Sequence, residues 1–160
     1  MKALLTLLLA SANLAGASGY GTLIDAIDKA QFRVIVYAPS IYDQELAESL
    51  RRARLDPIRK VSVRILSVPF YNFQPKSFML SLALAGVPVY EAQIPSLGGV
   101  VIVDNGGWTG PDLGKYVNAS VAALPPQEIN TSLKWFERTI QAAQVLTQVE
   151  AYERLKKVTP

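Results

Sequence analysis

Histidine and cysteine are both missing from this 160-residue chain. Reactions that need an imidazole or a thiol as nucleophile, acid or base are therefore excluded. The missing cysteines also exclude disulfides, so the fold must be stabilised by packing. Metal binding would depend on oxygen ligands alone, and no acidic pair or Ca²⁺ loop has the spacing for a site. We expect no metal and no cofactor.

Charge is also scarce, since 18% of the residues are charged and the formal net charge is +3. Hydrophobic residues make up 50% of the chain, which is enough to bury a core and too much for disorder. So small a charge excess argues against bulk electrostatic binding to nucleic acid, although a local basic patch is compatible with it. The length and the lack of linkers or repeats indicate one domain.

No apolar run is long enough to span a bilayer, and the most apolar segment lies at the N-terminus. Lys2 precedes a short apolar run over residues 3–10, and Ala15-Gly16-Ala17 matches the small-x-small pattern of a cleavage site. This pattern predicts a signal peptide over residues 1–17, with an uncleaved membrane anchor as the alternative. Residues 18–160 would then form a single periplasmic or secreted domain with a net charge of +2, because Lys2 is the one charge removed.

Hydrophobic periodicity alternates between helix and strand through residue 103. The predicted helices cover residues 23–30, 41–55 and 75–85, and the predicted strands residues 32–38, 61–68, 88–92 and 100–103. After Pro125-Pro126 we expect a long C-terminal helix from Ser132 to about Lys157, capped by Asn130 or Thr131. The pattern predicts an α/β fold, with a mixed, largely parallel sheet and helices on both faces.

The segment LGGVVIVDNGGWTGPD, which begins at Leu97, carries a family resemblance. With the elements before it, it resembles the phospholipase D superfamily, in particular its short single-motif bacterial branch. That family's motif is His, any residue, Lys, four residues and Asp, followed by Gly-Ser and Asn. Asp104 matches the Asp, whereas Leu97 stands at the His position and Gly99 at the Lys position.

The end of the motif is also degenerate in this chain. Gly110 lies one place early for the family's Gly, and Asp112 or Asn118 is a loose substitute for its Asn. In the family, the imidazole attacks phosphorus while Lys and Asn hold the phosphoryl oxygens. Leucine and glycine can do neither, and the chain has no histidine at any position. The resemblance therefore implies a pseudoenzyme.

Three groups of residues are candidates for a ligand site. The first is the remnant of the motif, a possible phosphate-side pocket made of Leu97, Gly99, Asp104, Trp108, Thr109, Gly110 and Asp112. Asp104 also has a simpler structural interpretation, because Asp-Asn-Gly-Gly after a strand is typical turn chemistry.

The second group is a basic run that includes Arg51, Arg52, Arg54 and Arg64, which is either a solvated face or an anion-binding patch. The third is the aromatic run Phe70-Tyr71-Asn72-Phe73, with Tyr42 and Trp108 as possible neighbours. Such aromatic residues fill cores or stack against bases.

Three functional hypotheses follow. The first is a non-catalytic, exported phospholipase D-like module that binds a phosphate-bearing ligand, either nucleic acid or a lipid head group, or a protein partner. The second is an assembly role, as a homodimer or as a heterodimer with an active relative. The third is an unrelated enzyme that uses Asp104, Asp112 or tyrosines as acid or base.

Overall fold

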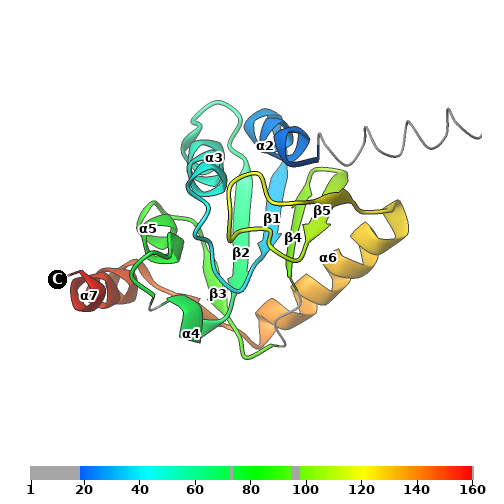
Figure 1. Ribbon diagram of the computed structural model, residues 1–160. Helices are drawn as coiled ribbons and strands as arrows, with labels where there is room; N and C mark the ends of the chain where they lie inside the picture. The colour runs from blue at the N-terminus through cyan, green and yellow to red at the C-terminus, as the bar shows by residue number, and fades with distance from the viewer. Residues whose placement is uncertain (1–18, 73, 95–97, 160) are drawn as a thin grey trace, which may run out of the picture.

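A seven-stranded mixed sheet runs through the molecule in the order β6-β5-β4-β1-β2-β3-β7 (Figure 1). The computed structural model describes residues 19–72, 74–94 and 98–159, so the predicted signal peptide and Leu97 lie outside the described residues. The strands are β1 Arg33–Tyr37, β2 Ser62–Ser67, β3 Val89–Glu91, β4 Gly99–Val103, β5 Gly106–Gly110, β6 Ala122–Ala123 and β7 Gln144–Leu146.

The sheet is mixed, as predicted, but its parallel part is limited to β1, β2 and β3. β4 returns to the other side of β1 and pairs with it antiparallel, and β5 and β6 continue as antiparallel neighbours. The predicted turn at Asp104 joins β4 to β5. The sequence pattern did not reveal β5, because its glycines carry no β-propensity signal.

Helices cover both faces of the sheet, as predicted (Figure 1). They are α2 Gly19–Lys29, α3 Gln44–Leu55, α4 Pro69–Asn72, α5 Met79–Leu84, α6 Pro126–Gln141 and α7 Gln148–Val158. The helices α2, α3, α5 and α7 bury the larger core on one face, and α6 covers the smaller core on the other. No helix within the described ranges is both long and apolar enough to cross a membrane.

Strand β1 separates the two cores because successive side chains point to opposite faces. Val34 and Val36 lie in the larger core, whereas Ile35 and Tyr37 lie in the core beneath α6. All four are buried, which explains the unbroken apolar run in the sequence.

Two predicted helices begin later than expected. The helix predicted from residue 41 begins at Gln44, because Asp43 caps it and accepts a 3.1 Å hydrogen bond from the Leu46 N–H. The helix predicted from residue 75 begins at Met79, because the preceding Phe78 N–H is bonded to the Ile41 carbonyl at 2.7 Å. Residues 75–78 are thereby drawn toward the end of β1.

The prediction of one long C-terminal helix from Ser132 to Lys157 is wrong. The segment is divided into α6, β7 and α7, and β7 pairs antiparallel with β3. Pairing satisfies the outer edge of β3 and buries Leu146. A capping box between Thr147 and Glu150 then starts α7. The second helix therefore begins inside a stretch whose hydrophobic periodicity looks like that of one continuous helix.

Helix α7 is attached to the sheet by a buried ion pair. Arg154 donates to Glu91 at 2.8 Å, and the Glu91 side chain is only 2% exposed. The same carboxylate accepts from the Asn72 amide at 2.6 Å, and that amide also donates to Ser67 at 2.8 Å. The cluster therefore ties α7 and α4 to the carboxyl ends of β2 and β3.

We predict that Arg154→Ala lowers the free energy of unfolding by about 3 kcal/mol, because it leaves Glu91 charged and buried without its cation. Urea denaturation measures the change. Lys157→Ala, on an exposed position of the same helix, is the control and should change stability little. Equal stability of the two variants would contradict the role assigned to the ion pair.

Candidate functional site

A cleft of about 490 Å³ opens at the carboxyl ends of the parallel strands. Ligands commonly bind at this end of open α/β sheets. We call it the tyrosine–lysine cleft, and its walls come from the loops after β1, β2 and β5 together with Gly98. The lining residues are Pro39, Ser40, Tyr42, Tyr71, Lys76, Gly98, Pro111, Leu113, Lys115 and Tyr116.

The lining contains three tyrosines and two lysines, and no carboxylate among the described residues. Lys115 forms a 3.2 Å ion pair with Asp112, with both side chains half exposed, so water screens much of that attraction. Lys76 is exposed and has no ion-pair partner in the described part of the chain. The cleft therefore favours an anionic ligand.

The cleft wall is held by the loop between β5 and β6. The Gly114 carbonyl accepts hydrogen bonds from the N–H groups of Tyr42 at 2.7 Å and Asp43 at 3.0 Å. Gly114 has a φ of 93°, which favours glycine. Asp43 also accepts a hydrogen bond from Tyr20, and burial together with this bond raises the pKa of the Tyr20 phenol well above its usual value. Tyr20 therefore stays neutral and continues to donate.

Gly99, which the sequence resemblance puts at the family's lysine position, has no room for a side chain. A β-carbon on Gly99 would lie 2.6 Å from the Leu113 carbonyl oxygen and 2.8 Å from the Leu113 β-carbon. Leu113 is itself buried in the larger core and packs into the space beside Gly99. A side chain at residue 99 would therefore have to displace Leu113.

Asp104 lies at the far end of β4 from the cleft. Its carboxylate accepts three backbone hydrogen bonds, from Gln31 at 2.9 Å, Phe32 at 2.9 Å and Arg33 at 3.0 Å. Burial alone would raise the Asp104 pKa, but these donors and the Arg33 charge outweigh it and hold the pKa below its ordinary value. The carboxylate thus joins the end of α2 and the start of β1 to the β4–β5 turn.

The other motif residues do not gather in one pocket. Trp108 packs on the α2 side of the sheet, whereas the Thr109 hydroxyl donates to the Gly99 carbonyl at 3.0 Å on the α6 side. Gly110 lies against the Ser120 carbonyl, where a β-carbon would come within 2.3 Å. Asp112 lies in the loop beside Lys115.

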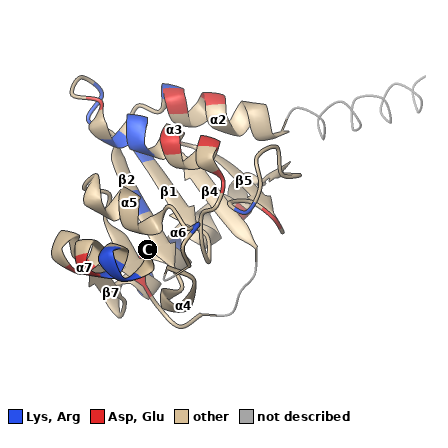
Figure 2. Cartoon of the chain, turned by 60° about the vertical axis from the view of Figure 1, so that its left-hand side comes forward, with Lys and Arg blue, Asp and Glu red and all other residues tan. Residues whose placement is uncertain are grey.

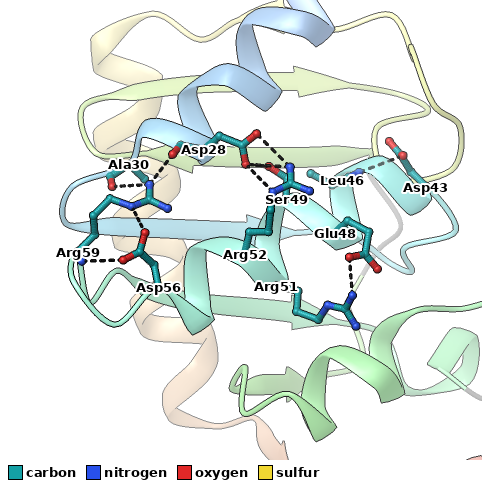
Figure 3. Close-up of polar contacts among 10 residues, drawn as sticks. All are labelled: Asp28, Ala30, Asp43, Leu46, Glu48, Ser49, Arg51, Arg52, Asp56 and Arg59. Carbon is teal, nitrogen blue, oxygen red and sulfur yellow. Dashed lines mark hydrogen bonds and ion pairs between the residues drawn. The ribbon is translucent and has the colours of Figure 1, made fainter.

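The predicted anion-binding arginines do not form a common surface. Arg51 and Arg52 on α3 pair with Glu48 and Asp28 (Figure 3). Arg54 donates to the Gly86 carbonyl at 2.8 Å.

Arg64 lies on the opposite face of the sheet from α3. It bonds Glu137 there and stacks 5.4 Å from the centre of the Phe136 ring. None of the four arginines lines the cleft. Basic and acidic residues lie close together on α2 and α3 instead (Figure 2).

Two lining residues of the cleft are among the candidates predicted from the sequence. Tyr42 and Tyr71 are aromatic candidates in the sequence and lie in the lining, whereas Phe73 lies outside the described residues. Lys76, Lys115 and Tyr116 were missed. Their signal was weak: Lys76 follows Pro75 in the segment between α4 and α5, where the sequence pattern predicts a helix, and Lys115 and Tyr116 follow Gly114 in the loop after β5.

Comparison with known proteins supports the fold. No family model matches the sequence, and no curated protein matches it. Among solved structures, the chain is similar to Nuc from Salmonella typhimurium, a phospholipase D family member, with 20% identity, a TM-score of 0.61 and coverage of 79% of this chain and 89% of that one.

NucT from Helicobacter pylori is similar at 15% identity, with a TM-score of 0.63 and coverage of 80% of this chain and 91% of that one. TrmBL2, an archaeal chromatin protein, is similar at 16% identity, with a TM-score of 0.56 and coverage of 89% of this chain and 61% of that one. The chain therefore has a phospholipase D-like fold, as the sequence resemblance implied.

We predict that Gly99→Ala destabilises the protein by about 2 kcal/mol, because the added methyl group must displace Leu113 in a packed core. Thermal and urea unfolding measure this. Gly21→Ala is the matched control, since a β-carbon there meets nothing within 4 Å and alanine favours its helix, so stability should be unchanged or increased. Equal stability of the Gly99 variant and wild type would show that the space is open.

We also predict a pH-dependent effect of Asp104→Asn. Asparagine tolerates the positive φ of 50° at this position but gives up the charge and one acceptor oxygen, so stability at pH 7 should fall by about 1 kcal/mol. Because the folded pKa lies below the unfolded one, the carboxylate's contribution is complete above the unfolded pKa and is lost as the pH falls through the folded pKa. The difference between variant and wild type should therefore shrink below about pH 4. A difference independent of pH would contradict this origin.

Proposed function

We propose that this protein is an exported, non-catalytic phospholipase D-like module that binds the phosphate backbone of single-stranded nucleic acid in the tyrosine–lysine cleft. One observation carries the proposal. The cleft beside Gly99 and Leu113 has two lysines and three tyrosines, and no carboxylate among its described lining residues. Export rests on the N-terminal sequence pattern alone.

The chemistry of the chain supports binding without cleavage. Attack on phosphorus in the phospholipase D family needs a histidine, and the sequence has none. A carboxylate enzyme is less well supported, because the Asp104 carboxylate is engaged by three backbone donors at the other end of β4, and Asp112 is paired with Lys115.

The aromatic side chains around the cleft favour nucleic acid over a lipid head group. Tyr116 is 65% exposed, and Phe70, which is 68% exposed, contacts the Tyr71 ring edge to face at 5.4 Å. Exposed rings beside lysines suit a single strand, whose bases stack while its phosphates meet cations. TrmBL2, whose fold is similar, shows a novel mode of DNA binding. A homodimer, or a heterodimer with an active relative, stays a prediction of the family resemblance.

Fluorescence anisotropy with a labelled single-stranded oligonucleotide tests the proposal. Binding should weaken as salt rises, and Lys76→Ala and Lys115→Ala should each reduce the slope of log affinity against log salt by about 0.7. Tyr71→Ala should weaken binding roughly 5- to 100-fold through lost stacking. Lys134→Ala on α6, outside the cleft, is the control and should bind as wild type does.

Vesicle-binding and cleavage assays with the same protein variants distinguish a nucleic-acid ligand from a lipid head group and from an active enzyme. Vesicles that contain anionic phospholipid should bind no better than neutral vesicles. Binding to those vesicles that depends on Lys76, without binding to the oligonucleotide, would assign the cleft to a lipid head group. Cleavage of the oligonucleotide or of a phosphodiester substrate by pure protein would overturn the non-catalytic assignment.

A further inference from the structure

A second and larger cavity adjoins the tyrosine–lysine cleft and shares Gly98 and Pro111 with it. It has a volume of about 860 Å³ and runs between α6 and the β4–β5 hairpin. We call it the α6 groove. Its lining residues are Tyr37, Gly98, Val100, Thr109, Gly110, Pro111, Ser120, Val121, Ala122, Thr131, Ser132, Trp135 and Arg138. Ligand pockets in proteins commonly have this size.

The body of the groove is apolar. The Tyr37 and Trp135 rings meet edge to face, with 5.3 Å between their centres and an angle of 74° between their planes, and Val100 lies beside them. A small neighbouring cavity of about 40 Å³ shares Tyr37, Val100, Ser132 and Trp135 with the groove and reaches Ile102 and Phe136 in the core beneath α6. The floor of the groove is therefore incompletely packed and apolar, which suits a hydrocarbon chain lying along it.

One cation, Arg138, lies at the solvent-exposed rim of the groove. The Arg138 guanidinium makes a 3.3 Å hydrogen bond to the Lys134 carbonyl through Nε, and no carboxylate within the described ranges pairs with it. The adjacent Glu137 does not neutralise it, because that carboxylate is bonded to Arg64.

The remaining polar groups of the groove are neutral. Thr131 and Ser132 contribute hydroxyls from the first half of α6, seven and six residues before Arg138. Seven helical residues span about 10 Å, so the groove has a neutral polar end, an apolar middle and a cationic end along the helix.

We propose that the α6 groove binds an amphiphilic monoanion, with a hydrocarbon chain along Trp135 and Val100 and a carboxylate on Arg138. A medium-chain fatty acid is the simplest ligand of this kind. The charge of Arg138, unneutralised beside an apolar slot, matches one anionic group on an apolar body. The groove shares Gly98 and Pro111 with the tyrosine–lysine cleft, but neither of the cleft's lysines lines it.

Tryptophan fluorescence provides a direct test. The chain has two tryptophans, of which Trp135 lines the groove and Trp108 packs against the α2 side of the sheet. In a Trp108→Phe variant, Trp135 is therefore the only tryptophan that reports binding. Titration with decanoate should change the Trp135 emission saturably. Arg138→Gln in that background should weaken decanoate binding roughly 10- to 100-fold, whereas it should leave binding of neutral decanol unchanged.

The control is Lys134→Gln, which removes an exposed cation one turn earlier on α6 that does not line the groove, and it should bind decanoate as the parent does. The oligonucleotide should not compete with decanoate, so the result stands whether or not the cleft binds nucleic acid. The proposal is overturned by the absence of a saturable Trp135 response, by equal effects of Arg138→Gln on decanoate and decanol, or by a stable dimer in solution that shields Trp135 and excludes decanoate.

Discussion

Leu113 packs so closely against Gly99 that any side chain at residue 99 would have to displace it. This contact determines which side chains fit at the end of the sheet where the tyrosine–lysine cleft opens. Gly98 and Gly110 likewise have no room for a side chain, since β-carbons there would come within 2.8 Å and 2.3 Å of backbone oxygens. The glycines let the loop between β5 and β6 approach the strands and form one wall of the tyrosine–lysine cleft, at the place where the family resemblance puts a cationic side chain.

The charged side chains of α3 and of the tyrosine–lysine cleft differ in how far they are neutralised. The basic residues of α3 are largely neutralised by neighbouring carboxylates or bonded to the backbone, as in the Arg52–Asp28 pair (Figure 3). At the other end of the strands, Lys76 and the half-exposed Lys115 face a cleft without a carboxylate among its described lining residues. Two lysines that a ligand can reach therefore line the cleft, although the arginines are the more conspicuous feature of the sequence.

Most of the central fold could be predicted from the sequence, because β1, β2 and β4 are buried runs whose pattern survives without tertiary context. The errors have a common cause. β7 was hidden because Gln144–Leu146 lies between two amphipathic segments and becomes a strand only by pairing with β3. The hairpin strand β5 was hidden because glycine has no propensity signal and its role depends on what packs against it. Lys76 and Lys115 were missed because the loop folding that places them at one cleft depends on backbone bonds such as that from Phe78 to Ile41.

An amide chemical-shift titration with a short single-stranded oligonucleotide tests the central claim most directly, because it reports both where the strand binds and whether it survives. The account predicts shifts concentrated at Ser40, Tyr71, Lys76, Lys115 and Tyr116, with the oligonucleotide recovered at full length. Shifts concentrated on α3 around Arg51 and Arg52, or recovery of a shortened oligonucleotide, would contradict it.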